Sequence, residues 1–218
     1  RRFCQDQIWN HVQHQVDLFQ CSRISRANSL YLAQSGTKYE DFRIERENWP
    51  KLKPNTPMGQ LPMLEIDGQQ LCQSMTMARF LARKFDLVPS NDLDAARADM
   101  FVDGVTELFP NIRPVAMAIM GGDDAKKTES WNTFKTETLK PFLEKYEAFL
   151  KKNGTGYLVG NKLTWADIVV AEILNRIVTI FDNTSVLDGH QHLIDLMKKV
   201  HELPNIKKYV DSRPQTPL

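Results

Sequence analysis

The sequence has 218 residues and a mass of 25.1 kDa, which is enough chain for one or two domains. Its 42% hydrophobic residues can build packed cores, and 28 Lys and Arg residues against 27 Asp and Glu residues leave a formal charge of +1. This balance gives no electrostatic support for a nucleic-acid or membrane partner, because either needs a concentrated positive face. No apolar stretch approaches the roughly 20 residues that cross a bilayer.

The three cysteines Cys4, Cys21 and Cys72 show neither a CxxC pair nor the spacing of a zinc set. An odd count in a chain that can build its own core is typical of reduced thiols in the cytosol. The first residues are basic and lead into polar residues, unlike a secretory signal, so we expect a cytoplasmic protein. The five histidines lack carboxylate or cysteine partners at ligand spacing, and no metal site is predicted.

The first 90 residues alternate between strand-like and helix-like patterns. Residues 14–19 are predicted to form a strand, and residues 26–34 a helix that ends at Ser35-Gly36. Residues 38–44 are predicted to form a second strand, with Tyr39, Phe42 and Ile44 as apolar anchors. The three segments together indicate a βαβ unit.

A hairpin and a helix follow. Residues 62–66 and 69–72 flank Asp67-Gly68, the dipeptide typical of a type I′ turn, because both central residues of that turn need positive φ. Pro62 stands at the first residue of a strand, where a missing amide is tolerated. Residues 74–85 are predicted to form a helix.

Everything after about residue 92 has helical periodicity, with apolar residues three and four positions apart. We therefore expect an α/β domain over residues 1–88 and an all-α domain over residues 92–218. Pro110 and Pro114 should kink or divide the first long helix, since proline removes a helical hydrogen bond. The predicted helices cover residues 93–120, 126–151, 164–181 and 191–201.

One short motif predicts where a helix begins. Thr164 and Asp167 have the Ser/Thr-x-x-Asp spacing of a capping box, in which hydroxyl and carboxylate satisfy helix amides reciprocally. We interpret this motif as structural rather than catalytic.

Two segments are candidates for binding an anion. A helix that starts at Gln73-Ser74 offers unpaired amides and a serine hydroxyl to a carboxylate, although a plain serine N-cap is the more common case. The loop with Trp49, Lys51 and Lys53 offers an indole donor and two ammonium groups, although loop lysines are commonly only solvated. The GxGxxG, GxxxxGK[ST] and GxSxG motifs are absent, which gives no support to dinucleotide-binding, P-loop or hydrolase functions.

Five segments carry a resemblance to a known family: residues 38–44, 49–54, 59–65, 73–82 and 163–167. Together they resemble the cytosolic glutathione S-transferases, most closely the sigma class, which includes haematopoietic prostaglandin D synthase. The resemblance runs from about Leu32 to Leu218. It implies a thioredoxin-like N-terminal domain, an all-helical C-terminal domain, a homodimer, and glutathione as co-substrate with no metal.

The resemblance also assigns roles to residues. Trp49 and Lys53 would bind the glycine carboxylate of glutathione, and the Leu61 backbone before a cis Pro62 would pair with the cysteinyl segment. Gln73-Ser74 would bind the γ-glutamyl carboxylate, which is the same place as the anion candidate found above. The implied glutathione-binding residues are Trp49, Lys53, Gly59, Gln60, Leu61, Gln73 and Ser74.

In this family an acidic residue of the partner subunit also reaches the γ-glutamyl amine. Asp103, Thr106 and Glu107 are the nearby choices in this sequence, and the register among them stays open.

The first 30 residues depart from the family pattern. The family has a tyrosine at the end of its first strand, whose hydroxyl donates to the glutathione sulfur and favours the nucleophilic thiolate. Counting back without gaps, that position falls on Leu18, which has no hydroxyl to donate.

Three explanations of Leu18 stay open. An altered exon or reading frame would explain why the resemblance decays abruptly. A folded relative that has lost the tyrosine would bind glutathione without catalysis or serve as a structural protein. A cysteine- or serine-type thioltransferase would use Cys21 or Ser22 at the start of the first helix, where helix amides lower a thiol pKa.

The predicted function is the conjugation of the glutathione thiolate to apolar electrophiles, with prostaglandin isomerisation as a side activity. Prostaglandin D synthases of this family carry a tryptophan directly after Leu-Phe-Pro, whereas here Asn111 follows Pro110, which weakens the prostaglandin hypothesis. The last seven residues, 212–218, nonetheless resemble the end of the vertebrate synthases.

Overall fold

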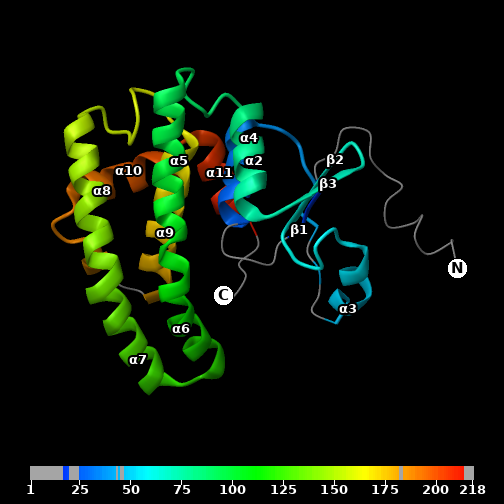
Figure 1. Ribbon diagram of the computed structural model, residues 1–218, viewed down its shortest axis with the longest axis horizontal. Coiled ribbons are helices and arrows are strands. Elements are labelled where there is room, and N and C mark those ends of the chain that lie inside the picture. The colour runs from blue at the N-terminus through cyan, green and yellow to red at the C-terminus, as the bar shows by residue number, and fades with distance from the viewer. Residues whose placement is uncertain (1–16, 20–24, 43, 45–46, 182–183, 214–218) are drawn as a thin grey trace, which may run out of the picture. The chain divides into compact units, whose positions relative to one another are not determined.

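A computed structural model describes residues 17–19, 25–42, 44, 47–181 and 184–213. The chain divides into two compact units between Phe85 and Asp86 (Figure 1). The N-terminal unit is a thioredoxin-like α/β domain and the C-terminal unit is all-helical. No helix within the described ranges is long and apolar enough to span a membrane.

The N-terminal unit is built on a three-stranded sheet in the order β1-β2-β3, in which both pairings are antiparallel. Helices α2 and α4 pack against each other (Figure 1) and bury Leu30, Leu32, Met77 and Leu81, which are at most 1% exposed. The elements of this unit are β1 (Asp17–Phe19), α2 (Ser25–Ser35), α3 (Trp49–Leu52), the 3₁₀ turn η1 (Lys53–Asn55), β2 (Met63–Ile66), β3 (Gln69–Cys72) and α4 (Ser74–Lys84).

The predicted hairpin is confirmed. Ile66 pairs with Gln69, so that Asp67 and Gly68 make a two-residue turn. Their φ angles are 49° and 74°, which places both central residues in the left-handed region that a type I′ turn requires. The predicted helix after Gln73 and the helix that ends at Ser35 are also present, within one or two residues of the expected bounds.

The predicted second strand over residues 38–44 is wrong for the described part of that range. Only Glu40 makes an isolated β-bridge, and the neighbouring described residues are irregular. The apolar side chains that supported the prediction are not buried, because Phe42 is 37% exposed and Tyr39 and Ile44 are only partly covered. Because the described residues of 38–44 bury no apolar face, joining the sheet would gain them little hydrophobic stabilisation.

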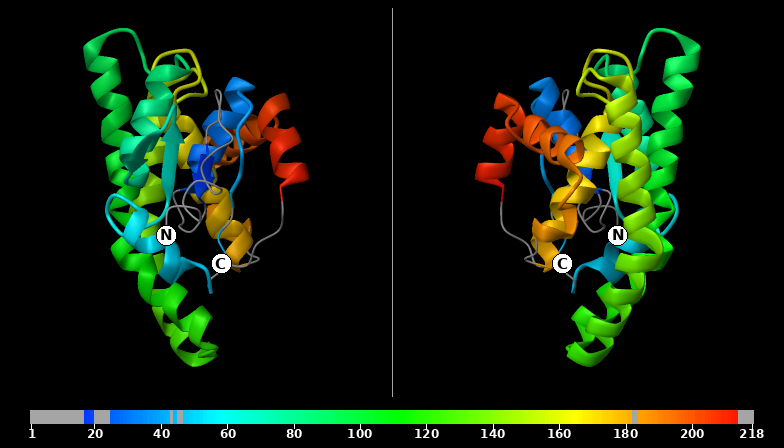
Figure 2. Two further views of the ribbon diagram at one scale, coloured as in Figure 1. Left: turned by 90° about the vertical axis from the view of Figure 1, so that its right-hand side faces the viewer. Right: turned by 90° about the vertical axis from the view of Figure 1, so that its left-hand side faces the viewer.

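The C-terminal unit contains the remaining helices, and α6 and α7 run side by side (Figure 2). One predicted helix is exact, over residues 191–201, whereas the last helix was not predicted. The elements are α5 (Asp92–Thr106), α6 (Leu108–Gly121), α7 (Asp124–Thr133), the π-helical segment η2 (Phe134–Leu139), α8 (Lys140–Asn153), α9 (Trp165–Phe181), the 3₁₀ turn η3 (Thr184–Leu187), α10 (Gln191–His201) and α11 (Pro204–Ser212).

The first long predicted helix is divided near Pro110, but α6 continues through Pro114, and the second continues through Pro141 with a π-helical segment before it. The first breaks at Glu107, which ends α5 and precedes α6, and Pro110 lies in the first turn of α6, where its missing amide costs little. The second passes through the π-helical segment immediately before Pro141, which stands in the first turn of α8. Proline cannot donate to the carbonyl four residues earlier, so the turn before it widens.

Gly104 lies inside α5 for a packing reason. The Tyr146 hydroxyl of α8 donates to the Phe101 carbonyl at 2.6 Å, and a Cβ atom on Gly104 would clash with that hydroxyl. Glycine therefore permits a close approach between α8 and α5.

Asp167 organises the entrance to α9. Its Oδ2 accepts from the Thr164 amide (2.7 Å) and the Thr164 hydroxyl (2.8 Å), and its Oδ1 accepts from the Leu158 amide (2.8 Å). The Asp167 carboxylate accepts from the Thr164 amide, as a capping box requires, so this half of the prediction is confirmed. The Thr164 hydroxyl does not accept from a helix amide as expected but donates to the same carboxylate. Burial raises the pKa of Asp167 to about 6, although the hydrogen bonds and Lys199 act in the opposite direction.

We predict that Asp167→Asn lowers the melting temperature and alters the pH dependence of stability. The folded pKa of Asp167 lies above its ordinary 3.8, so the folded state binds more protons between about pH 4 and 6. The free energy of unfolding therefore falls as pH rises through that window and is level above it. Asparagine cannot titrate, so the stability difference between wild type and variant should shrink from pH 4 to pH 7, by on the order of 1–3 kcal/mol.

Urea unfolding at both pH values measures this difference, with the exposed Asp188→Asn as the matched control. Parallel wild-type and Asp167→Asn stability curves would contradict the assignment.

Candidate glutathione site

Three strand ends meet at one end of the N-terminal sheet. Phe19, the last residue of β1, pairs with Met63, the first residue of β2, and Met63 pairs with Cys72, the last residue of β3. The segment before Met63 and the segment after Cys72 therefore leave the sheet side by side. These two segments contain Leu61-Pro62 and Gln73-Ser74, so the pairing register brings together residues that are more than ten positions apart.

The first turn of α4 is open at its N-terminus. Gln73 precedes it with φ 69° and ψ 113°, and its side chain makes no capping hydrogen bond to the helix. The first intrahelical bond of this turn runs from the Met77 amide to the Gln73 carbonyl, so the amides of Ser74, Met75 and Thr76 have no helical acceptor. Such a terminus attracts a carboxylate through its amides and its partial positive charge.

The loop from Asn48 to Gly59 places a cation beside a glycine. Trp49 begins α3 and is partly buried, and Lys53 begins η1 and is exposed. Gly59 has φ 61°, and a Cβ atom there would lie 3.4 Å from Lys53 Cε, so the lysine stem lies across the glycine. The Thr56 hydroxyl donates to the Lys53 carbonyl at 2.8 Å, which fixes the turn that carries the lysine.

Gln60 and Leu61 connect this loop to the sheet. The peptide bond between Leu61 and Pro62 is cis, as the family resemblance implied. Gln60 is exposed and Leu61 is partly exposed.

One contact links the loop directly to α4. The Gln73 amide Nε2 donates to the Met58 sulfur at 3.2 Å. Met58 is 60% exposed, and sequence reasoning did not single it out, because no local pattern pairs positions 58 and 73.

A second residue that sequence reasoning missed is Asn28 of α2. Its Nδ2 donates to the Ser74 carbonyl at 3.3 Å, from 46 positions away, and its side chain is fully buried. The sequence does show a polar residue on the same helix face as Tyr31 and Leu32. Its hydrogen-bond partner, however, depends on the tertiary fold and cannot be predicted from local sequence.

Of the residues considered for catalysis, the structure describes Leu18 but not Cys21 or Ser22. Leu18 lies in β1, opposite Leu64, one residue from the end of the sheet where Phe19, Met63 and Cys72 meet. Cys21 and Ser22 lie outside the described residues. Cys72 has a free thiol and is partly exposed.

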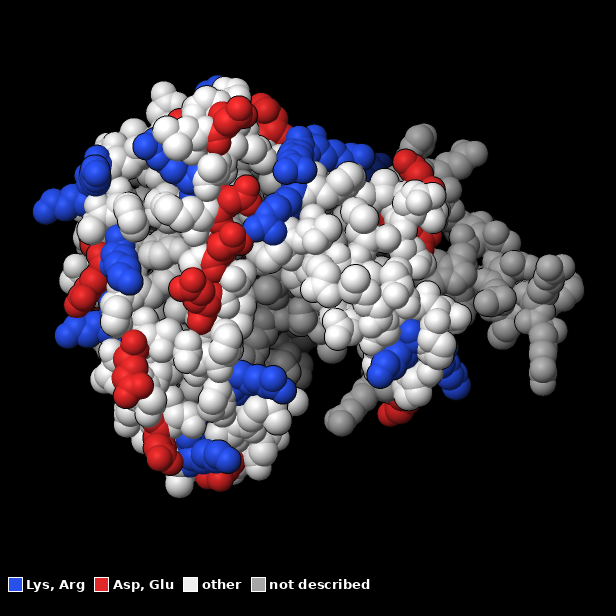
Figure 3. Space-filling view, viewed as in Figure 1, with Lys and Arg blue, Asp and Glu red and all other residues white. Residues whose placement is uncertain are grey.

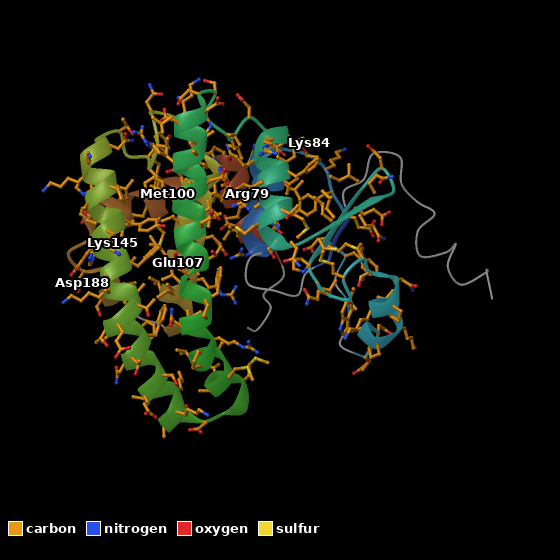
Figure 4. All side chains as sticks on the ribbon, viewed as in Figure 1. Arg79, Lys84, Met100, Glu107, Lys145 and Asp188 are labelled. Atoms are coloured by element: carbon orange, nitrogen blue, oxygen red, sulfur yellow. The ribbon has the colours of Figure 1, made fainter. Side chains whose placement is uncertain are left out.

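The acidic candidates lie at the C-terminal end of α5, where Asp103 is in the last turn and Glu107 is the residue that follows the helix. Asp103 and Glu107 are exposed and four positions apart, hence on one helix face, and the Thr106 hydroxyl donates to the Asp103 carbonyl at 2.6 Å. Burial raises the pKa of Tyr146, and the charges of Glu107 and Asp103 raise it further. Figure 4 marks Met100 on this helix and Glu107 directly after it.

Acidic and basic side chains are interspersed on the face shown in Figure 3, in keeping with the near-zero net charge. Within the described ranges, no group of three or more His, Cys, Asp or Glu side chains is placed to hold a metal ion.

Comparison with known proteins matches both units to one family. Residues 14–83 match the glutathione S-transferase N-terminal domain, and residues 111–213 match the glutathione S-transferase C-terminal domain. Glutathione S-transferase 1 of Ascaris suum is 35% identical over 205 residues, covering 94% of this chain and 98% of the relative.

Two solved structures have the same fold. A monomeric glutathione S-transferase of the hookworm Necator americanus is 31% identical with a TM-score of 0.86, covering 95% of this chain and 100% of the hookworm chain. Prostaglandin synthase D of Nilaparvata lugens is 33% identical with a TM-score of 0.82, covering 92% of this chain and 100% of the other.

The chain belongs to the glutathione S-transferase family.

Proposed function

We propose that this chain binds glutathione along the end of its N-terminal sheet, in a domain within residues 1–88 that precedes a helical domain within residues 92–218. The observation that carries the proposal is the open first turn of α4 at Gln73-Ser74, beside the loop that carries Lys53. The α4 amides would bind the γ-glutamyl carboxylate, and Trp49 and Lys53 the glycine carboxylate. Gln60 and Leu61 connect this loop to β2, and the Leu61 backbone would pair with the cysteinyl segment.

The reaction we propose is transfer of the glutathionyl group to an apolar electrophile. The glutathione sulfur, as a thiolate, attacks an electrophilic carbon, a C–S bond forms and the leaving group departs with its electron pair. Protein donors near the sulfur favour the thiolate, and positioning supplies much of the remaining acceleration. Leu18 offers no hydroxyl for this purpose, so slow turnover is expected of this chain.

Substitutions in the site should weaken glutathione binding. Lys53→Ala removes one ammonium from a charge-assisted contact, and Ser74→Ala removes one hydroxyl donor. We expect the dissociation constant for glutathione to rise about tenfold for Lys53→Ala, or about 1.4 kcal/mol, and severalfold for Ser74→Ala.

Isothermal titration calorimetry measures both, with Lys51→Ala as the control because Lys51 is an equally exposed cation in the same loop. Equal losses for Lys51→Ala and Lys53→Ala would show a general charge effect and reject the assigned site.

The second prediction concerns catalysis. Leu18→Tyr should restore a hydroxyl at the end of β1 and raise the rate of conjugation to a chlorodinitrobenzene-type substrate tenfold or more, while glutathione affinity changes little. Steady-state kinetics on both forms, with retention on glutathione resin checked in parallel, gives the comparison.

Other outcomes distinguish the alternatives. Retention on the resin with no turnover in either form supports a non-catalytic binding or structural protein, which Leu18 itself favours. Disulfide exchange that Cys21→Ser abolishes supports a thioltransferase. Robust turnover by the unaltered chain would refute the argument from Leu18.

For the second substrate, we propose apolar electrophiles in general. The similarity to prostaglandin synthase D of Nilaparvata lugens supports an additional isomerase activity, and Asn111 after Pro110 counts against it. We also propose a cytoplasmic location, which three cysteines without CxxC or zinc-site spacing support.

We further propose a homodimer of the sigma-class type, in which Asp103 or Glu107 of one subunit approaches the glutathione amine of the other. Support comes from the C-terminal unit, where Met100 and Phe149 are 50% and 41% exposed and line a pocket of about 390 Å³. Contiguous exposed apolar surface marks protein–protein interaction sites, and these two side chains would contribute to such a surface.

Sedimentation velocity tests the assembly. We expect a dimer for the wild type, a monomer for Met100→Glu, and a dimer for Met117→Glu, because Met117 is similarly exposed at 57% but does not line this pocket. A monomeric wild type, the state named for the hookworm relative, would overturn the proposal.

A further inference from the structure

Asn28 is buried in a way that packing alone does not explain. Its side chain has no exposed surface, and its α2 neighbours Leu30 and Leu32 are also fully buried. Its Nδ2 donates to the Ser74 carbonyl, while Oδ1 is buried and has no hydrogen-bond partner within the described part of the chain. A leucine of similar volume would fill this position without leaving an acceptor unsatisfied.

The carbonyl that Asn28 contacts belongs to the peptide group between Ser74 and Met75. The amide of the same peptide group is the Met75 N–H, one of the three first-turn amides of α4 without a helical acceptor. A donor on the carbonyl of a peptide group polarises its N–H, which then donates more strongly. The bond from Asn28 to the Ser74 carbonyl is therefore placed to strengthen the Met75 N–H as a hydrogen-bond donor.

Asn28 also restrains the turn mechanically. Helices α2 and α4 pack against each other, and this bond ties α2 to the first residue of α4. The residue just before that turn, Gln73, has φ 69°, a conformation that non-glycine residues rarely adopt and that the surrounding structure must maintain. A buried bond to Ser74 is placed to maintain it.

We propose that Asn28 is a positioning residue for the carboxylate site at the N-terminus of α4, and that it acts through the Ser74–Met75 peptide group without touching the ligand. This inference rests on the proposed glutathione function and deepens it. It identifies the γ-glutamyl end of glutathione as the part whose binding depends on α2. The buried, unpaired Oδ1 is retained because the donor on the same amide group is needed at Ser74.

The test is glutathione affinity, measured by calorimetry on the full chain. Asn28→Leu removes the donor and the unpaired acceptor together, so we expect a five- to tenfold rise in the dissociation constant and an unchanged or raised melting temperature. Ser35→Ala is the matched control on α2, because its hydroxyl donates to the Leu32 carbonyl and contacts Thr37 rather than α4. That variant should bind within twofold of the wild type.

Double variants separate a positioning role from a general loss of structure. Asn28 and Ser74 would serve the same carboxylate, so the effects of Asn28→Leu and Ser74→Ala should be less than additive. Lys53 serves the other end of glutathione, so Asn28→Leu and Lys53→Ala should be additive. Additivity in both pairs, or an Asn28→Leu affinity within twofold of the wild type, would overturn the inference.

Asn28→Ala covers the case in which leucine does not fit, because alanine removes the same donor without adding bulk. If it folds and binds glutathione as the wild type does, the inference is likewise rejected. If the wild type itself does not bind glutathione, the proposed function fails, which is a distinguishable result.

Discussion

The pairing of Met63 with Cys72 in the β2–β3 hairpin is the constraint on which the candidate site depends. This single register places the residues after the cis bond next to the start of α4, and the pairing of Met63 with Phe19 adds the end of β1 to the same place. A slip by one residue would move every side chain of one strand to the opposite face and shift Leu61-Pro62 relative to Gln73-Ser74. The two-residue turn at Asp67-Gly68 fixes the register, because its backbone twist matches that of the strands.

The first turn of α4 differs from those helix N-termini that carry a side-chain cap. In the C-terminal unit, side chains occupy the first turns of several helices: Asn91 accepts from the Asp94 amide in α5, and Asp123 accepts from the Lys126 amide in α7. Glu147 of α8 accepts from two first-turn amides of α10, and these bonds together with His192 lower its pKa despite partial burial. The first turn of α4 has no such side-chain cap. Helices α6 and α11 also lack a side-chain cap, so what distinguishes α4 is an open first turn that lies next to the residues around the cis bond.

Much of the fold could be predicted from the sequence because it follows from local chemistry. The Asp-Gly turn, the helix break near Pro110 and the acidic residue at the start of α9 depend on residues a few positions apart, whereas the π-helical segment before Pro141 was not predicted. The strand over residues 38–44 was mispredicted, because alternation of apolar residues does not reveal whether they become buried. The contacts of Asn28 with Ser74 and of Met58 with Gln73 could not be predicted, since each joins positions that only the folded chain brings together. The sequence shows that a leucine stands at the position of the family's tyrosine. Its effect on the activation of the glutathione thiol has to be measured by conjugation kinetics.

The most direct test of the account is an NMR titration of the isotope-labelled protein with glutathione, observing backbone amides. We expect the largest shifts for Ser74, Met75 and Thr76, with a second group around Trp49 and Lys53. In Asn28→Leu the Met75 shift should be smaller, while the shifts around Lys53 should be retained. Saturable shifts confined to other residues, or no shifts at millimolar glutathione, would contradict a glutathione site at this end of the sheet.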